Sequence, residues 1–257
     1  MKLLFFGDVV GRTGRSVVAR FLEAEKKNYD LVIANADNVA SGRGPTEKTY
    51  AEMLEAGVDV LTCGDHIWDQ KEVTRIFEKK NCCLVRPANY PKICPGKGFI
   101  SFNILGQDVL IVAMLGRVFT AEGMDSPFQV IDEILKSNKE KIVIVDFHAE
   151  ATSEKMAFGY DMAGKVSAVL GSHTHVQTSD ERIIDGKTAY ISDTGSCAAF
   201  ESVIGVKHEQ SIKRFRTGMP VTFEVAEGDA QINAVSIEID EATGHATSIE
   251  RINKIVE

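Results

Sequence analysis

Short runs of apolar residues alternate with amphipathic stretches from the first residues of the chain. A short apolar run is typical of a buried strand, and apolar residues that recur with helical spacing are typical of a helix packed on a core. The pattern predicts a strand at Lys2–Phe6, a helix at Thr13–Lys27 and a strand at Leu31–Ala34, which together form a β-α-β unit. The alternation continues with helix Thr46–Ala56, strand Asp59–Thr62, helix Asp69–Lys79 and the strand-like run Cys82–Arg86.

The middle of the chain breaks this alternation, because Phe99–Leu105 and Val109–Leu115 flank residues 106–108 as in a β-hairpin. Beyond the hairpin, the pattern predicts helix Pro127–Asn138, strand Lys141–Asp146, helix Thr152–Ala163, strand Ser167–Leu170, and the strand-like segments Thr188–Ser192, Met219–Val225 and Ala230–Ile239. No repeat and no low-complexity linker interrupts the chain, so we expect a single domain over residues 1–257. The simplest arrangement is an α/β fold in which two packed mixed sheets are flanked by helices, with the strand-end loops gathered at one edge.

Composition narrows the class of protein. The 257 residues are 44% hydrophobic and 26% charged, which is usual for a globular protein and argues against disorder, collagen-like repeats and coiled coils. A formal net charge of −8 argues against a protein that binds the DNA backbone or an anionic membrane, so we expect neither as a partner. The five cysteines form no C-x-x-C pair, and no apolar run approaches the roughly 18 residues that span a bilayer. The apolar run near the first residue is too short for the core of a signal peptide, and we therefore expect a cytoplasmic protein.

Metal-binding residue types gather directly after the predicted strands. The group consists of Asp8, Asp37, Asn38, Asp65, His66, His148, His173 and His175. A single histidine after a strand is often an ordinary loop residue, but donors after five strands form a pattern that such loops do not explain. In an extended segment, the i, i+2 spacing of His173 and His175 directs both rings to the same side.

These donors suit particular ions and a particular reaction. Carboxylate oxygens, an amide oxygen and imidazoles bind Mn²⁺, Fe²⁺ or Zn²⁺, and the absence of thiolates argues against a closed structural zinc site. The donors outnumber the needs of one ion with open positions, so we expect two divalent ions about 3.5–4 Å apart that share a carboxylate, with Asp37 as the candidate. Such a pair lowers the pKa of a shared water and stabilises the attacking and leaving oxygens of a phosphoryl centre. The donor set therefore predicts hydrolysis of a phosphate ester.

The same residues carry a family resemblance. The blocks at Asp8, at Asp37-Asn38, at Gly64-Asp65-His66, at the isolated His148 and at Gly171–His175 resemble the ordered blocks of calcineurin-type metallophosphoesterases. The longer blocks Gly7–Arg15, Leu115–Phe119 and Val145–Lys155 resemble the bacterial YmdB-like branch. The resemblance implies a four-layer α/β/β/α sandwich and a di-metal centre, with iron or manganese favoured over zinc. It also implies phosphodiesterase activity toward 2′,3′-cyclic nucleotides and a homo-oligomeric state.

The resemblance also implies a role for each residue. By position in the family's blocks, Asp8, Asp37, Asn38 and His175 would hold the first metal, and Asp37, Asp65, His148 and His173 would hold the second. His66 would bind no metal and would face the phosphate or the leaving group as an acid or charge stabiliser. Two positions depart from the branch, which usually has Glu in place of Asp37 and Asn in place of Asp65. Both residues can coordinate, but the added charge leaves the metal preference and the turnover rate open.

We therefore expect a metal-dependent phosphodiesterase in which a metal-bound hydroxide attacks a small phosphodiester, with a 2′,3′-cyclic nucleotide favoured and RNA as a further candidate substrate. Two alternatives stay open. One is a regulatory protein whose metal centre organises a binding surface, an alternative motivated by Asp37 and Asp65. The other is a phosphomonoesterase or nuclease on the same scaffold. Among the remaining polar residues, Glu150 is a candidate support for His148, and His208 and His245 are assigned to surface loops.

Overall fold

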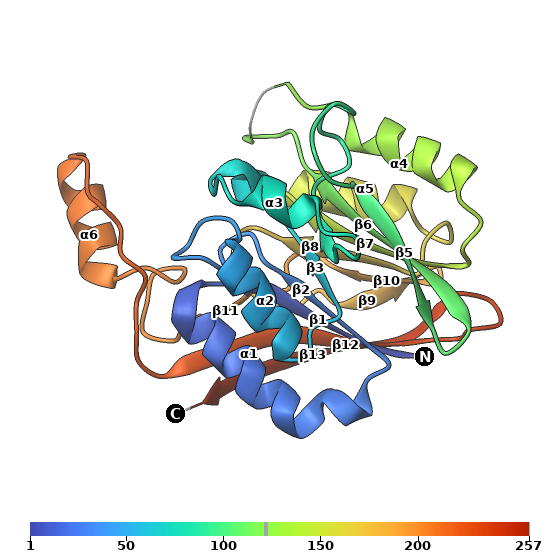
Figure 1. The fold of residues 1–257 in the computed structure, drawn as a ribbon, viewed down its shortest axis with the longest axis horizontal. Helices are drawn as coiled ribbons and strands as arrows, with labels where there is room; N and C mark the ends of the chain where they lie inside the picture. Colours follow the sequence, from blue (N-terminus) through green and yellow to red (C-terminus); the bar gives the residue numbers. More distant parts are fainter. Residues whose placement is uncertain (121–122, 257) are drawn as a thin grey trace.

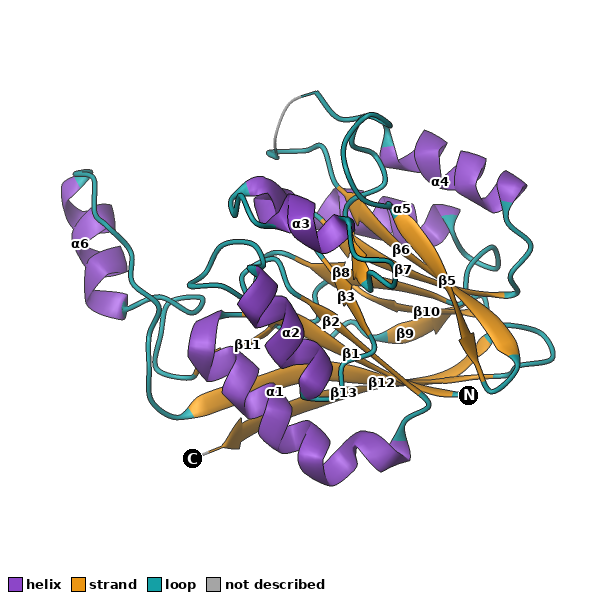
Figure 2. Ribbon diagram, viewed as in Figure 1, coloured by secondary structure: helices purple, strands orange, loops and turns teal. Residues whose placement is uncertain are grey.

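The structure is a computed structural model that describes residues 1–120 and 123–256. Two β-sheets pack face to face, and helices cover their outer faces (Figures 1 and 2). The first sheet has the order β13-β12-β11-β1-β2-β3-β4, and the second has the order β5-β6-β7-β8-β10-β9. The strands of the first sheet are β1 (Lys2–Val9), β2 (Leu31–Asn35), β3 (Val60–Thr62), β4 (Leu84–Val85), β11 (Ser196–Ala199), β12 (Ala230–Ile239) and β13 (Ala246–Val256).

The second sheet contains the predicted hairpin and the strands that follow it. Its strands are β5 (Phe99–Ile104), β6 (Gln107–Leu115), β7 (Ile142–His148), β8 (Ala168–Ser172), β9 (Arg182–Ile184) and β10 (Thr188–Ile191). The helices are α1 (Gly11–Glu25), α2 (Glu47–Glu55), α3 (Val73–Phe77), α4 (Pro127–Ser137), α5 (Thr152–Asp161) and α6 (His208–Thr217), with short 3₁₀ helices η1 (Lys26–Asn28) and η2 (Asp65–Trp68). Within the described ranges, no helix combines the length and the apolar character needed to cross a membrane.

Alternating side chains of β1 show how the layers are built. Leu3 and Phe5 pack between the two sheets, whereas Leu4 and Phe6 pack toward α1 and α2. Because successive side chains of a strand point to opposite faces, a strand segment buried on both faces is expected to be apolar, as Leu3–Phe6 is. A third core, in which Phe158 of α5 is fully buried, fills the space between the second sheet and its helices. Three apolar cores separate four layers, and the predicted α/β/β/α arrangement is confirmed.

Strand direction decides where the site lies. Strands β1, β2 and β3 run parallel, and so do β6, β7 and β8. The carboxyl ends of parallel strands meet at one edge of a sheet, which is where ligands bind in such folds. Residues that follow these strands in the sequence are thereby brought together from distant parts of the chain.

Several sequence predictions in the last third were wrong. Met219–Val225 is not a strand: Val225 makes only an isolated bridge with Val206, and Val221, Phe223 and Val225 line a cavity. His208 begins helix α6 and does not lie in a loop. This helix was missed because its sequence is strongly polar and carries no continuous apolar stripe. Strand β13 was missed because it forms the edge of its sheet, where many of its side chains are exposed.

Candidate metal centre

The predicted donors lie on both sheets, at the carboxyl ends of their parallel strands. Asp8 lies in β1, residues 37 and 38 follow β2, and residues 65 and 66 lie in η2 after β3. His148 is the last residue of β7, and residues 173 and 175 follow β8. A cavity of about 320 Å³ is lined by the residues Asp37, Asn38, His66, Glu150, His173, Thr174, His175 and Ile204. The packing of one sheet on the other thus brings five separate segments to one place.

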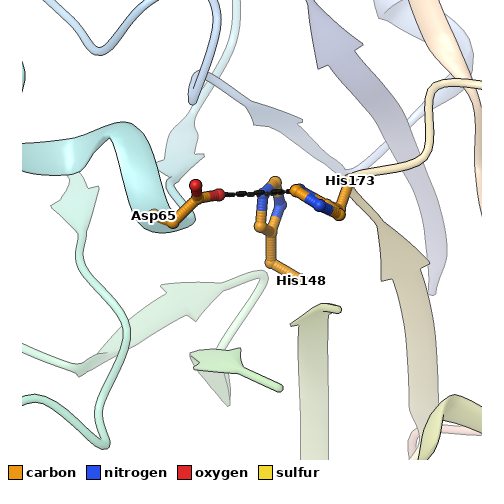
Figure 3. Close-up of side chains that lie close together, drawn as sticks. All are labelled: Asp65, His148 and His173. Carbon is orange, nitrogen blue, oxygen red and sulfur yellow. Dashed lines mark hydrogen bonds and ion pairs between the residues drawn. The ribbon is translucent and has the colours of Figure 1, made fainter. Parts of the chain in front are cut away.

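Three of the donors form a tight cluster, shown in Figure 3. His148 Nε2 lies 3.1 Å from Asp65 Oδ1 and 3.0 Å from His173 Nδ1. His173 Nδ1 in turn lies 3.5 Å from Asp65 Oδ1. Two ring nitrogens and a carboxylate oxygen therefore converge on one point, with all three ligand atoms within 4.8 Å of one another. This spacing suits three ligands of one ion.

A second group of donors surrounds His175. Its Nε2 lies 3.1 Å from Asn38 Oδ1 and 3.9 Å from Asp8 Oδ1. Asp8 Oδ1 is buried and has no hydrogen-bond partner, although buried polar atoms are nearly always satisfied. An orphaned carboxylate oxygen beside an amide oxygen and an imidazole nitrogen is what a divalent cation would satisfy. The donors therefore fit a second cation.

Asp37 lies against the first group of donors. Its Oδ2 is 3.4 Å from His148 Nε2, and its Oδ1 accepts hydrogen bonds from the backbone N–H groups of Gly64 and His66, at 2.7 Å and 3.1 Å. These bonds fix the carboxylate against the turn that carries Asp65. The short side chain is held in place by backbone donors, and the bridging role expected for Asp37 stays a prediction.

In each of the three donor histidines, one ring nitrogen contacts an oxygen that belongs to neither donor group. His148 Nδ1 lies 2.9 Å from Ser172 Oγ, His173 Nε2 lies 3.0 Å from Glu150 Oε2, and His175 Nδ1 lies 2.9 Å from the carbonyl oxygen of Ile204. Because these oxygens accept a hydrogen bond, they assign the N–H to that side of the ring. The other nitrogen of each ring then presents a lone pair to the cluster, which is the arrangement that orients histidines bound to metals.

The pKa values show how much negative charge converges on the site. Burial raises the pKa of Asp37 above its ordinary value. Burial would also raise the pKa of Asp65, but hydrogen bonds with His148 and His173 lower it well below its usual range. Burial would lower the pKa of His148, yet the carboxylates of Asp37, Asp65 and Asp8 raise it to about 10. The site therefore favours a positive charge at His148 Nε2, either a proton or a metal ion that displaces it.

A buried polar network supports His148. Ser172 Oγ donates to Asp146 Oδ1 at 2.6 Å, and Asp146 Oδ2 accepts from Asn35 Nδ2 at 2.8 Å and from Thr62. The sequence carried a signal for this network, because Asp146 interrupts an apolar strand, but Asn35 and Thr62 come from the other sheet. Glu150 was expected to support His148, and the structure instead places it against His173.

The loop that carries His173 and His175 differs from its expected conformation. Both residues have left-handed backbone conformations, with φ of 98° and 67°, so the extended geometry assumed for their i, i+2 spacing is wrong. Asp193 holds this loop by accepting hydrogen bonds from the N–H of Thr174 at 2.9 Å and from its hydroxyl at 2.7 Å. Asp193 is itself paired with buried Lys155, at 2.7 Å. Neither residue of this pair was predicted from the sequence.

Gly64 permits the close approach of the two sheets at the site. A Cβ at this position would lie 2.1 Å from Cδ2 of His148, closer than any side chain tolerates. The residue therefore has to be glycine for the Asp65 turn and the His148 ring to meet.

His66 lies at the edge of the cluster. Its side chain is 30% exposed, and its Nδ1 lies 3.0 Å from Asp69 Oδ2. It lines the 320 Å³ cavity and an adjoining cavity of about 690 Å³. A ring held at one nitrogen by a carboxylate, with the other nitrogen available to a cavity, is able to transfer a proton to a bound ligand.

Comparison with known proteins identifies the family. The family described as "YmdB-like protein" matches residues 4–252 of this chain. The chain belongs to the YmdB-like family. A relative from Bacillus subtilis (strain 168), named 2′,3′-cyclic-nucleotide 2′-phosphodiesterase, is 42% identical over 256 residues, covering 98% of this chain and 96% of its own.

Two solved structures extend the likeness to the whole fold. A hypothetical protein from Thermus thermophilus has a TM-score of 0.95 and 39% identity, with all of both chains covered. A protein from Mycoplasma pneumoniae described as a novel phosphatase has a TM-score of 0.94 and 38% identity, covering 100% of this chain and 94% of its own. The family resemblance drawn from the sequence blocks is confirmed.

Proposed function

We propose that this protein is a metal-dependent phosphodiesterase that hydrolyses 2′,3′-cyclic nucleotides. The observation that carries the proposal is the convergence of His148, His173 and His175 with carboxylate and amide oxygens beside one cavity, which His173 and His175 line. Membership of the YmdB-like family supports a phosphoester as substrate, and the name of the Bacillus subtilis relative supports the cyclic nucleotide.

We assign the donors to two divalent ions. Asp65, His148 and His173 would hold one ion, Asp8, Asn38 and His175 would hold the other, and Asp37 would contribute to both. Oxygen and imidazole donors without thiolate favour iron or manganese, with zinc as the alternative. Ions bound there would supply a water of lowered pKa and would neutralise charge on the phosphate.

His66 is assigned the proton transfer. Its ring is oriented by Asp69, 3.0 Å from Nδ1, so the Nε2 side is left to face a ligand in the cavity. Hydrolysis of a cyclic diester breaks one P–O bond and leaves an alkoxide, which needs a proton. Asp69 would also stabilise the imidazolium before that proton is given up.

Metal depletion and reloading test the proposal. Chelator-treated protein, reloaded separately with Mn²⁺, Fe²⁺ or Zn²⁺, should bind about two ions per chain by elemental analysis and hydrolyse 2′,3′-cyclic AMP only when loaded. Comparison with phosphomonoesters and with single-stranded RNA separates the diesterase from a phosphomonoesterase or nuclease. Absence of turnover with every metal and ester would refute the enzymatic proposal and favour the regulatory alternative.

We also propose a cytoplasmic location and a homo-oligomeric state. The location is supported by the five cysteines, all of them free, as expected in a reducing compartment. Chromatography coupled to light scattering tests the oligomeric state.

A further inference from the structure

The 320 Å³ cavity, which is lined by part of the donor set, adjoins a larger one. The 690 Å³ cavity shares Asn38, His66, His175 and Ile204 with the smaller cavity. Its volume lies within the range of about 300–1,000 Å³ that is usual for small-molecule sites. The smaller cavity is lined by charged and imidazole side chains, and the larger one is mostly apolar on the far side. A ligand with a phosphate at one end and an uncharged body at the other would fit this division.

The far wall of the larger cavity is an arm formed by residues 200–229. Figure 1 shows that α6, which belongs to this arm, stands away from the two sheets. The arm contributes Phe215 and Phe223 to the cavity, with the Arg214 guanidinium 6.0 Å from the centre of the Phe223 ring. Phe215 leaves 84% of its surface exposed, and Phe223 leaves 43%. Neither ring belongs to a hydrophobic core among the described residues, so the fold itself does not account for them.

The arm is fixed to the metal site. His175 Nδ1 donates to the carbonyl oxygen of Ile204 at 2.9 Å, and within the arm the N–H of Ala226 donates to the carbonyl of Gly205 at the same distance, which joins the two ends of the arm. The base of the arm also packs on Val10, because a Cβ at Gly205 would lie 2.7 Å from the Val10 side chain. The same bond that orients His175 therefore sets the position of the aromatic wall relative to the phosphate site.

We infer that the aromatic wall of the arm, made by Phe215 and Phe223, binds the nucleobase of the substrate while the phosphate occupies the metal cavity. This inference rests on the proposed function and names the part of the substrate that the enzyme recognises. Stacking on aromatic side chains suits every base, because each base has a π-face, and an arginine beside the rings adds a cation–π contribution. The enzyme would accordingly prefer cyclic phosphates that carry a base over those that lack one.

The test compares two substrates with the same five-membered cyclic phosphate. One is 2′,3′-cyclic AMP, and the other is glycerol 1,2-cyclic phosphate, which has no base. The variants are Phe215→Ala, Phe215→Trp and the double variant Phe215→Ala/Phe223→Ala, all loaded with metal. Phe119→Ala serves as a matched control, because Phe119 is 88% exposed and is not among the residues that line either cavity.

We expect Phe215→Ala to lower kcat/KM for 2′,3′-cyclic AMP by about 5- to 140-fold. This range converts the usual free-energy cost of removing one aromatic side chain that stacks on a base into a ratio. The value for glycerol 1,2-cyclic phosphate, the metal content and the melting temperature should stay at the wild-type level. Phe215→Trp should retain the preference for the nucleotide, and the control should leave it unchanged.

Two results would overturn the inference and one would overturn the proposed function. If kcat/KM is the same for both substrates in the wild type and in every variant, the rings do not contact the base. An equal loss on both substrates together with a smaller particle in light scattering would show that the arm is an interface between copies. If the loaded wild type hydrolyses neither diester, the proposed function fails, and the inference falls with it.

Discussion

The buried pair Lys155–Asp193 should be essential for holding the histidine loop, and Lys155→Met tests this. Both side chains are almost fully buried, at 2% and 1% exposure, and Nζ lies 2.7 Å from Oδ2. The substitution keeps the length of the side chain and removes its charge, which leaves the carboxylate of Asp193 without a counter-ion.

The size of the effect follows from what remains around Asp193. Breaking a buried ion pair by removing one partner costs about 3–5 kcal/mol. Asp193 keeps three other donors, namely the N–H and hydroxyl of Thr174 and the N–H of Gly195. We therefore expect the free energy of unfolding to fall by about 3 kcal/mol, the lower end of that range. For a chain of this size, the melting temperature should then be lower by about 6–12 °C. Since Thr174 lies between His173 and His175, metal binding should weaken by about 10- to 100-fold.

Thermal unfolding followed by circular dichroism, and Mn²⁺ titration of chelator-treated protein, measure the two effects. Lys165→Met is the matched control, because Lys165 pairs with Asp161 at 3.1 Å on the exposed face of the protein. Exposed pairs of this kind contribute about 0–1 kcal/mol, so the control should melt close to the wild type. In the Lys155→Met background, Asp193→Asn should lower the stability by less than it does in the wild type, because it removes the carboxylate that Lys155→Met leaves without a counter-ion. A Lys155→Met protein that melts with the control and binds Mn²⁺ normally would refute the reasoning.

Further predictions concern the metal centre itself. Gly64→Ala should lower the metal content per chain, because the new Cβ would lie 2.1 Å from Cδ2 of His148 and displace its ring; full metal content by elemental analysis would contradict this. His66→Ala should keep its metals and lose about 10²–10⁴ in turnover, the usual loss for an acid–base group, with His245→Ala as a control; an equal loss of metal would show that His66 is a ligand. Between pH 6 and 8 the affinity for Mn²⁺ should rise with pH, since the pKa of His148 is raised to about 10 and the ion has to displace its proton; an affinity that does not change with pH in competition titrations would contradict this.

The fold class was predictable because its signals are local. The run Leu31–Ala34, and Lys2–Phe6 after its first residue, are apolar, as strands buried on both faces tend to be, and both form strands in the structure. The prediction failed where local pattern and tertiary role diverge. The apolar residues of Met219–Val225 suggested a strand but face a cavity, and the polar helix α6 showed no apolar stripe because it packs on no sheet.

The candidate site was predictable in its residues and not in its arrangement. The sequence placed Asp8, Asp65 and His148 at strand ends, and parallel strands bring their ends to one edge. It could not supply the left-handed conformation of His173, because backbone dihedrals there depend on Asp193, which is far along the chain. Nor could it assign Glu150, which lies next to His148 in sequence and against His173 in space.

By itself, then, the sequence determined which elements form, which residues are able to bind metal, and which family the chain resembles, because periodicity and residue chemistry are written in neighbouring positions. Only the tertiary structure decided which nitrogen of each histidine faces the cavity, which carboxylate oxygen is left without a partner, and what lines the space beyond the metals. Those properties arise from contacts between neighbouring strands, between the two sheets, and between the sheets and the arm. Such contacts join residues that are separated in sequence, by 24 positions for His148 and Ser172 and by 165 for Asp8 and His173, and local sequence carries no record of them.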